Sequence, residues 1–154
     1  MPNYNGVWSL TTQLQYNVDW PVFSQPRALF LGGNTGSKET VIQFIDVTTT
    51  GNASDFGDLT AGRASLMSAS SKIRAVAAGG NTGSAVNVID YVTIASEGNA
   101  SDFGDLSSTS QEGTGTGSST RGLFQLGLAT DNVNTIEYVT IASVGNATDF
   151  GDLS

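Results

Sequence analysis

The stretch "GNASDFGDL" at residues 98–106 decides the fold of this chain, because it occurs three times. The same nine residues stand at 51–59, and "GNATDFGDL" stands at 145–153, so each copy lies 47 residues after the previous one. A single motif with two acids, two glycines and one phenylalanine would suggest a binding site. Three copies at one spacing indicate a repeat architecture instead.

The repeat extends well beyond this motif. Arg27, Arg74 and Arg121 fall in register at the same spacing and each opens a short apolar stretch. Stretches rich in β-branched and aromatic residues follow each arginine and predict strands; they lie at 39–50, 87–97 and 134–144. We therefore divide the chain into three repeat units, 27–73, 74–120 and 121–154.

One unit contains four predicted strands, near 27–31, 40–48, 53–59 and 62–70. The first two are joined by "GGNTGS", whose glycines and asparagine suit a tight hairpin.

The third unit reaches Ser154 without its fourth strand, and we expect residues 13–26 to supply it. Val18, Trp20 and Val22 alternate there as in a half-buried strand. The predicted organisation is an N-terminal arm, 1–12, followed by a single three-blade repeat domain, 13–154.

The predicted fold class is all-β, with three four-stranded blades of a β-propeller in each chain. In "TVIQFIDV" (40–47) both alternating sets of side chains are largely apolar, so both faces of this strand should be buried. Sheets of a propeller are covered on both faces by neighbouring blades. A β-trefoil or a β-prism is the alternative.

Three blades are too few to close a propeller, so we expect the ring to be completed by oligomerisation. Head-to-tail contacts close into a ring or propagate as a filament. Two chains, giving six blades, are favoured over three, and the N-terminal strand of one subunit should complete the last blade of its neighbour. The expected residues of this subunit junction are Val18, Trp20, Val22, Phe150 and Leu153.

Composition excludes several classes of function. Six Lys and Arg stand against fourteen Asp and Glu, and a net charge of −8 argues against nucleic acid as a partner. The N-terminus lacks the charged and apolar regions of a signal peptide, and no apolar run is long enough for membrane insertion.

The chain is not expected to be an enzyme. It has no Cys and no His, and near-identical copies of its acids provide no asymmetric acid and base pair. Asn52, Asp55 and Asp58 lack the dense acids of a calcium loop, so they should bond turn backbone and no metal or other cofactor is expected.

The string "NxIxYVTIASxGNAxDFGDLS", preceded by "RGLF", closely resembles the kelch-like repeats in structural proteins of tailed bacteriophages, including phages of cyanobacteria and marine bacteria. The resemblance covers nearly the whole chain from Arg27 onward. It implies a β-propeller displayed on a virion, in a tail fibre or another surface appendage, after synthesis in the host bacterial cytoplasm.

The resemblance also implies partners. A structural or adhesive virion protein would bind copies of itself, other virion proteins and, as a further candidate, a host-surface glycan. Tyr4 and Trp8 on the N-terminal arm are the expected anchors for another virion protein. A glycan-binding, lectin-like module and an open filament-forming protein are the alternative functions.

Overall fold

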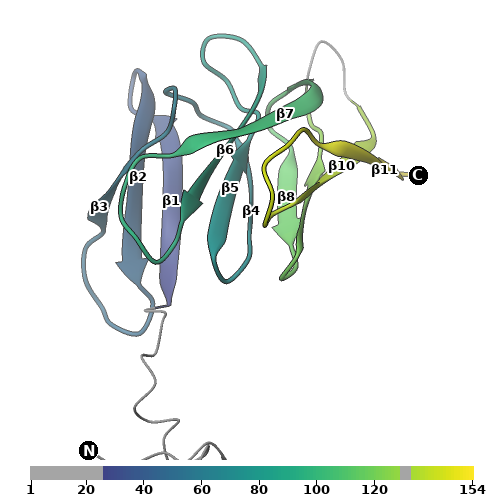
Figure 1. The fold of residues 1–154 in the computed structure, drawn as a ribbon. Helices are drawn as coiled ribbons and strands as arrows, with labels where there is room; N and C mark the ends of the chain where they lie inside the picture. The colour runs from purple at the N-terminus through teal and green to yellow at the C-terminus, as the bar shows by residue number, and fades with distance from the viewer. Residues whose placement is uncertain (1–25, 129–132) are drawn as a thin grey trace, which may run out of the picture.

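The computed structural model describes residues 26–128 and 133–154, and in them the chain forms strands and turns without a helix (Figure 1). The strands are β1 (Arg27–Asn34), β2 (Lys38–Asp46), β3 (Ser54–Asp58), β4 (Met67–Ser70), β5 (Arg74–Ala78), β6 (Val86–Thr93), β7 (Ser101–Ser110), β8 (Thr114–Gly117), β9 (Arg121–Gln125), β10 (Thr135–Thr140) and β11 (Thr148–Asp152).

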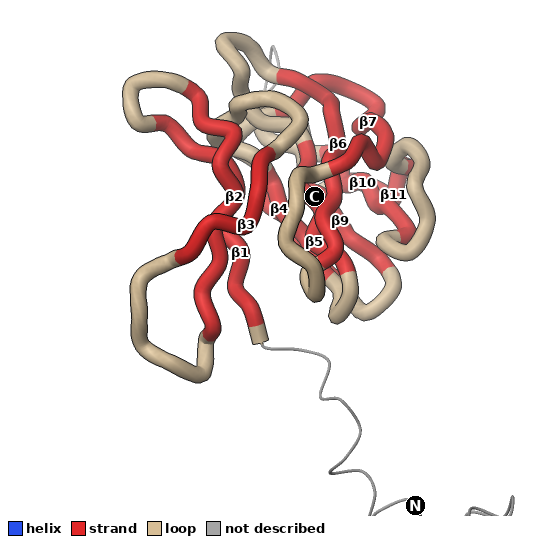
Figure 2. The backbone as a smooth tube through the Cα atoms, turned by 60° about the vertical axis from the view of Figure 1, so that its left-hand side comes forward, coloured by secondary structure: helices blue, strands red, loops and turns tan. Residues whose placement is uncertain are grey.

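These strands form three antiparallel sheets, in which strands consecutive in the chain lie side by side (Figure 2). The first sheet has the order β1-β2-β3, the second β4-β5-β6-β7 and the third β8-β9-β10-β11. The predicted all-β class is confirmed, and the four strands expected in the first unit correspond to β1 to β4.

The hairpins of the first two units follow the predicted turn chemistry. Asn34 Oδ1 accepts a hydrogen bond from Gly36 N at 3.2 Å, and Asn81 Oδ1 accepts one from Gly83 N at 2.8 Å. Gly36 and Gly83 have φ angles of +115° and +134°, which favour glycine. The asparagine and glycine of "GGNTGS" therefore fix the reversal after β1 and after β5.

The boundaries of the sheets differ from the predicted units by one strand. β4 was expected to close the sheet of the first unit, but it pairs with β5, with Ser70 opposite Ala75. The reason is the length of the connections, because only three residues separate β4 from β5 whereas eight separate β3 from β4. The expectation that residues 13–26 supply the fourth strand of the third sheet is also wrong, because β8 already takes that place. Residues 13–25 themselves lie outside the described residues.

Two hydrophobic clusters fill the spaces between neighbouring sheets. Phe56 and Leu59 of the first motif copy share a cluster with residues of β5 and β6. Phe103 and Leu106 of the second copy share a cluster with residues of β9 and β10. Each of these four side chains is at most 4% exposed. The repeated phenylalanine and leucine thus anchor one sheet on the next.

The second and third sheets make backbone contact where β4 lies against β8. A Cβ added to Gly115 would lie 2.2 Å from the carbonyl oxygen of Ser68, and one added to Gly117 would lie 2.8 Å from that of Ser70. The glycines of "TGTG" therefore permit close approach of two strands. This explains why β8 lacks large apolar side chains.

Gly115→Ala should lower the free energy of unfolding by about 1–3 kcal/mol, because the added methyl group forces these strands apart. Gly51→Ala is the matched control, since a Cβ at Gly51 meets no atom within 4 Å. Urea denaturation of dilute protein, followed by circular dichroism, measures the free energy of unfolding of both variants. Equal effects of the two substitutions would contradict the close contact.

A buried ion pair lies between the first two sheets. Arg63 Nη2 is 2.6 Å from Asp90 Oδ2, and both side chains are fully buried. Arg63 Nη1 also donates to the carbonyl oxygens of Gly79 and Val88, at 3.0 and 2.8 Å. Burial lowers the pKa of Arg63, and the charge of Asp90 opposes this shift.

Arg63→Met should lower the free energy of unfolding by about 3–5 kcal/mol, because it leaves the carboxylate of Asp90 buried without its cation. Lys72, which is exposed in the turn before β5, provides the control, and Lys72→Met should change stability by less than about 0.5 kcal/mol. Thermal and urea unfolding test the pair. Similar values for the two variants would refute a structural role for the buried ion pair.

Candidate assembly interface

The repeated motif links the first sheet to the second through hydrogen bonds along the outer edge of β3. Gly98 N donates to Phe56 O at 2.8 Å, and Ala100 N donates to Asp58 O at 2.7 Å. Asp58 N donates in return to Asn99 Oδ1 at 3.1 Å. The Gly-Asn-Ala of one copy therefore binds the Asp-Phe-Gly-Asp of the preceding copy, and we call this set of bonds the clasp.

The same clasp joins the second sheet to the third. Gly145 N donates to Phe103 O at 2.7 Å, and Ala147 N donates to Asp105 O at 2.8 Å. Asp105 N donates to Asn146 Oδ1 at 3.0 Å. Each bond is displaced by one repeat from its counterpart, so the chain uses one type of junction twice.

The glycine in the middle of the motif lets the two backbone segments of the clasp approach each other closely, because it has no side chain. A Cβ added to Gly57 would lie 2.4 Å from Gly98 O, and one added to Gly104 would lie 2.6 Å from the backbone of Gly145. Any side chain here would separate the hydrogen-bonding partners. At Gly151, the third copy, an added Cβ meets no described atom within 4 Å.

A hydroxyl residue and an acid reinforce each junction. Thr60 Oγ1 donates to the carboxylate of Asp90, with both distances at 2.8 Å. One repeat later, Ser107 donates to the carboxylate of Glu137, and its backbone N lies 3.1 Å from Glu137 Oε2. Asp90 and Glu137 are buried between the sheets, so these bonds offset the cost of burying their polar groups.

The repeated arginines span the junctions as well. Arg27 Nη1 donates to Ile94 O at 3.1 Å, and Arg27 also forms an ion pair with Glu97. Arg74 Nη1 donates to the carbonyl oxygens of Ile141 and Ala142. A link between repeated Arg side chains and the next sheet is thus observed, with backbone carbonyls as the shared acceptors.

Arg121 makes the same cation–π contact as Arg74 but, among the described residues, not the hydrogen bonds to a neighbouring sheet. Its guanidinium carbon lies 4.6 Å from the ring centre of Tyr138, as Arg74 lies 4.5 Å from Tyr91. Within the described ranges no hydrogen bond or ion pair of its guanidinium is found. The cation–π contact holds the guanidinium over Tyr138, whose ring packs edge-on against the exposed Phe150.

The third sheet presents an open tail face, which we define by Phe150, Leu153 and the free edge of β11. Phe150 is 52% exposed and Leu153 is 49% exposed, although their counterparts in the first two copies are buried. The clasp has no counterpart at Phe150 or Asp152 among the described residues. The two predicted junction residues that the structure describes, Phe150 and Leu153, are therefore exposed, and no clasp bond from another described residue covers them.

The first sheet presents an open head face, defined by Phe30, Gln43 and residues 51–53. Phe30 is 54% exposed, whereas its repeat counterparts, Ala77 and Phe124, are buried. Gly51, Asn52 and Ala53 are exposed and match the Gly-Asn-Ala segments of the two clasps. A hollow of ≈ 290 Å³ lies on the same face, with Phe30 and Gln43 in its lining.

The turn after β2 at this face is fixed by local hydrogen bonds. Thr48 donates to Asp46 Oδ1 from its hydroxyl at 2.6 Å and from its backbone N at 2.8 Å. These bonds lower the pKa of the Asp46 carboxyl. The turn carries the carbonyl of Val47, which is the repeat counterpart of Ile94 and Ile141.

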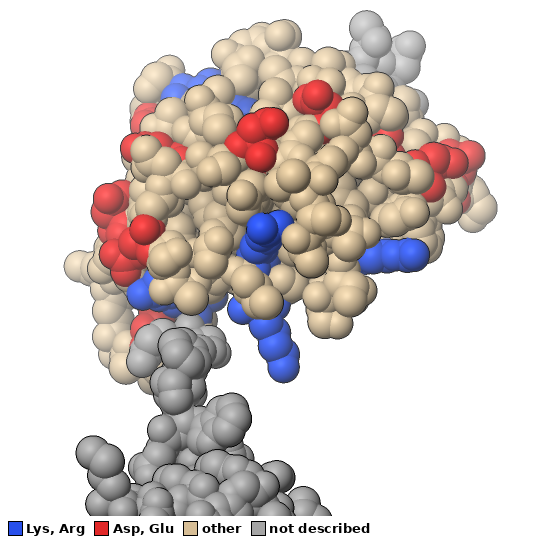
Figure 3. All heavy atoms as spheres, in the orientation of Figure 1, with Lys and Arg blue, Asp and Glu red and all other residues tan. Residues whose placement is uncertain are grey.

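The exposed charged side chains are spread over the surface of the molecule. Figure 3 shows the acidic side chains in several separate groups over the drawn face, with basic side chains mainly toward its lower edge. In residues 26–128 and 133–154 no three His, Cys, Asp or Glu side chains come together as metal ligands. None of the described residues belongs to a helix long and apolar enough to cross a membrane.

The other expected junction residues, Val18, Trp20 and Val22, lie outside the described residues, as do Tyr4 and Trp8 of the arm. Sequence reasoning missed the role of the repeated asparagines, which it assigned to local turns. Asn99 and Asn146 instead accept hydrogen bonds from residues 41 positions earlier. Their recurrence at the repeat spacing was the available signal.

Neither a protein-family model nor a curated protein sequence matches the chain significantly.

Asn99→Ala and Asn146→Ala should each lower the free energy of unfolding by about 0.5–1.5 kcal/mol, because each removes one hydrogen bond of a clasp. Asn52→Ala is the matched control, since Asn52 lies on the open head face and should leave the stability of the single chain unchanged. Urea denaturation of dilute protein compares the three variants. A loss of stability in Asn52→Ala equal to the others would contradict the assignment.

Proposed function

We propose that this protein is a structural protein that assembles head to tail with copies of itself. One observation carries the proposal: the two open faces hold the two halves of a junction that the chain already forms twice. The tail face exposes Phe150 and the free edge of β11, and the head face exposes Gly51, Asn52 and Ala53. A contact between different surfaces of identical chains is heterologous, and such contacts repeat.

The expected contacts follow from the internal clasps. Gly51 N of one copy would donate to Phe150 O of the next, and Ala53 N would donate to Asp152 O. Asp152 N would donate in turn to Asn52 Oδ1. These bonds would cover the edge of β11, which is otherwise open to unwanted pairing.

Side chains at the same faces support this arrangement. Arg121 would reach the carbonyl of Val47 in the neighbouring copy, as Arg27 reaches Ile94 and Arg74 reaches Ile141 inside the chain. Phe150 and Leu153 would be buried against Phe30. The contact would thereby remove the large exposed apolar side chains of both faces from water.

A closed ring would make the fold a β-propeller, which is the finer fold assignment that we propose. Three sheets joined by one type of junction are typical of successive blades of a β-propeller, and two chains would supply six blades. We favour this dimer over a nine-bladed trimer. The expectation that residues 13–26 complete the last blade is replaced, because the third sheet already has four strands.

The biological setting rests on the resemblance of the repeats to kelch-like proteins of tailed bacteriophages. We propose that the assembly is a structural or adhesive component of the virion, in a tail fibre or surface appendage. Other virion proteins, through the arm with Tyr4 and Trp8, and a host-surface glycan are the further proposed partners. No enzymatic role is proposed.

Phe150→Asp should abolish self-association, and Phe30→Asp should do the same from the opposite face. Truncating or charging a central apolar anchor should weaken the contact about 30-fold or more. Size-exclusion chromatography with light scattering should give twice the 15.9 kDa chain mass for the natural sequence and the single-chain mass for each variant. Ile73→Asp is the control, because Ile73 is 67% exposed but lies in the turn between β4 and β5.

Mixing the two variants distinguishes a head-to-tail contact from a symmetric one. Phe150→Asp retains a sound head face and Phe30→Asp retains a sound tail face, so the mixture should form one-to-one pairs that stop at two chains. A natural chain that is a monomer at all accessible concentrations would overturn the proposal. Filaments in negative-stain micrographs would support the contact and overturn ring closure.

A further inference from the structure

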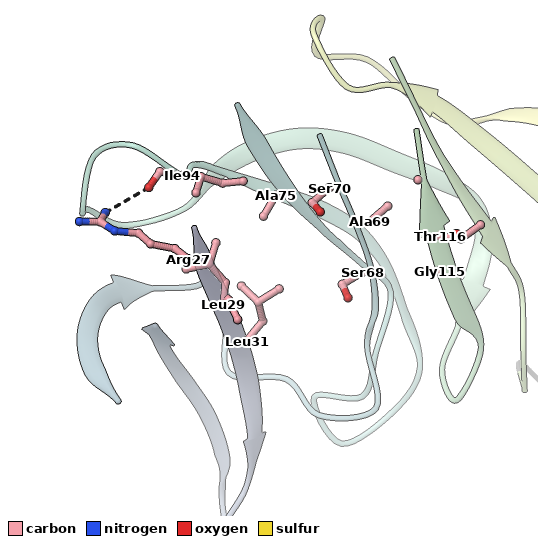
Figure 4. A pocket seen from close by; sticks show the side chains of 12 residues that line it. Arg27, Leu29, Leu31, Ser68, Ala69, Ser70, Ala75, Ile94, Gly115 and Thr116 are labelled. Carbon is pink, nitrogen blue, oxygen red and sulfur yellow. Dashed lines mark hydrogen bonds between the residues drawn. The ribbon is translucent and has the colours of Figure 1, made fainter. Parts of the chain in front are cut away.

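A cavity of ≈ 410 Å³ lies along the free edge of β1, between the three sheets (Figure 4). Leu29 and Leu31 of β1 line one side, and Ser68 and Ser70 of β4 line the opposite side. β8 completes the lining with Gly115 and its neighbours. The lining strands β4 and β8 are the first strands of their sheets, whereas β1 begins a sheet of three strands.

The first strand of each four-stranded sheet comes from the same position in the repeat. β4 ends four residues before Arg74, and β8 ends four residues before Arg121. Both pair with the following strand in the same register: Ser70 lies opposite Ala75, and Gly117 lies opposite Gly122. Residues 20–23, "WPVF", hold this position before Arg27.

The turn that makes this pairing possible has a sequence signature. Ser71 N donates to Arg74 O at 2.9 Å, and Ser118 N donates to Arg121 O at 2.8 Å. The hydroxyl oxygen of each serine also accepts hydrogen bonds from the backbone N of the arginine and of the residue before it. Ser24 stands three residues before Arg27, as the two other serines stand before their arginines.

The described end of this segment already follows the common path. Val47 N donates to Pro26 O at 2.9 Å, just as Ile94 N donates to Ile73 O at 2.8 Å. The third unit repeats the bond between Ile141 and Thr120 at 2.9 Å. Pro26, the described residue before β1, thus makes the same bond as its repeat counterparts Ile73 and Thr120.

We propose that residues 20–23 occupy this cavity as the fourth strand of the first sheet, beside β1 of their own chain. The repeat fixes the register, with Trp20 opposite Leu31, Val22 opposite Leu29 and Phe23 opposite Ala28. The occupant is therefore the chain's own N-terminal segment, whereas Trp20 and Val22 were expected to join the last sheet of a neighbour. A three-residue connection to β1 is too short to reach a neighbouring sheet.

Proline is compatible with this position. Antiparallel ladders alternate hydrogen-bonded and non-hydrogen-bonded pairs. Since Ser71 and Arg74 are bonded, Ser68, three positions along the ladder, falls in a non-hydrogen-bonded pair opposite Ala77. Pro21 is the repeat counterpart of Ser68, so its missing N–H would point away from β1.

The size of the side chains also suits the cavity. Met67 and Ala69 of β4 point toward the third sheet and are buried, and Trp20 and Val22 are their counterparts. Ser68 and Ser70 carry side chains at the positions where β8 has glycines (Figure 4). The proposed strand of residues 20–23 must therefore lie further from β4 than β8 does. Bulky residues at 20 and 22 fill this wider space against Leu29 and Ala75.

A disulfide tests the strand and its register in the full chain, which contains no Cys. The variant is Phe23→Cys with Ala28→Cys, and the positive control is Ser70→Cys with Ala75→Cys, the equivalent observed pair. Both pairs should oxidise within the chain to an extent that agrees within about twofold, because the proposed register gives them the same Cβ separation. Phe23→Cys with Leu29→Cys is the off-register control and should stay reduced.

Peptide mapping by mass spectrometry under non-reducing conditions gives the outcome. An intrachain link between positions 23 and 28 supports the proposal. A link between two chains would assign the cavity to a neighbouring copy, and free thiols with a linked positive control would leave it without this strand; either result overturns the proposal. Repeating the experiment with Phe150→Asp separates it from self-association, since the intrachain link should persist in a monomer.

Discussion

The clasp between successive copies of the motif is the interaction on which the rest of the structure depends. In each clasp, backbone N–H groups that precede the last strand of one sheet donate hydrogen bonds to the carbonyl oxygens on the outer edge of the preceding sheet. An outer strand has unpaired N–H and C=O groups, and every such strand in a repeat needs cover. By coupling that cover to the buried phenylalanine and leucine, the motif fixes both the spacing of the sheets and their direction of succession.

This dependence explains which parts of the molecule could be predicted from its sequence. Strand positions follow from stretches rich in β-branched and aromatic residues and from turn residues such as Asn34 and Gly36, which act over short distances. The burial of Phe103 also follows from the pattern, since a repeated aromatic residue in a strand usually belongs to a core. These features are local or periodic, and the sequence carries them directly.

Features that depend on neighbouring units were not predictable in the same way. The assignment of β4 to the second sheet depends on which of its two connections is short enough to form a hairpin, and the predicted strand near 62–70 was too broad to decide this. Arg63 has no arginine counterpart in the second unit, where Ser110 takes its place. A residue that occurs once in a repeat gives no periodic signal, even when it forms the buried ion pair of a junction.

Gln43 on the head face has a consequence for the energetics of assembly. The inner junctions bury the carboxylates of Asp90 and Glu137 at this repeat position, and folding must compensate the loss of their hydration once. In the proposed contact between chains, the neutral amide of Gln43 would remove that desolvation cost. Association and dissociation at this face would then proceed without transferring an ion at this position out of water, so the proposed junction between chains would be more easily reversed than the two inner junctions.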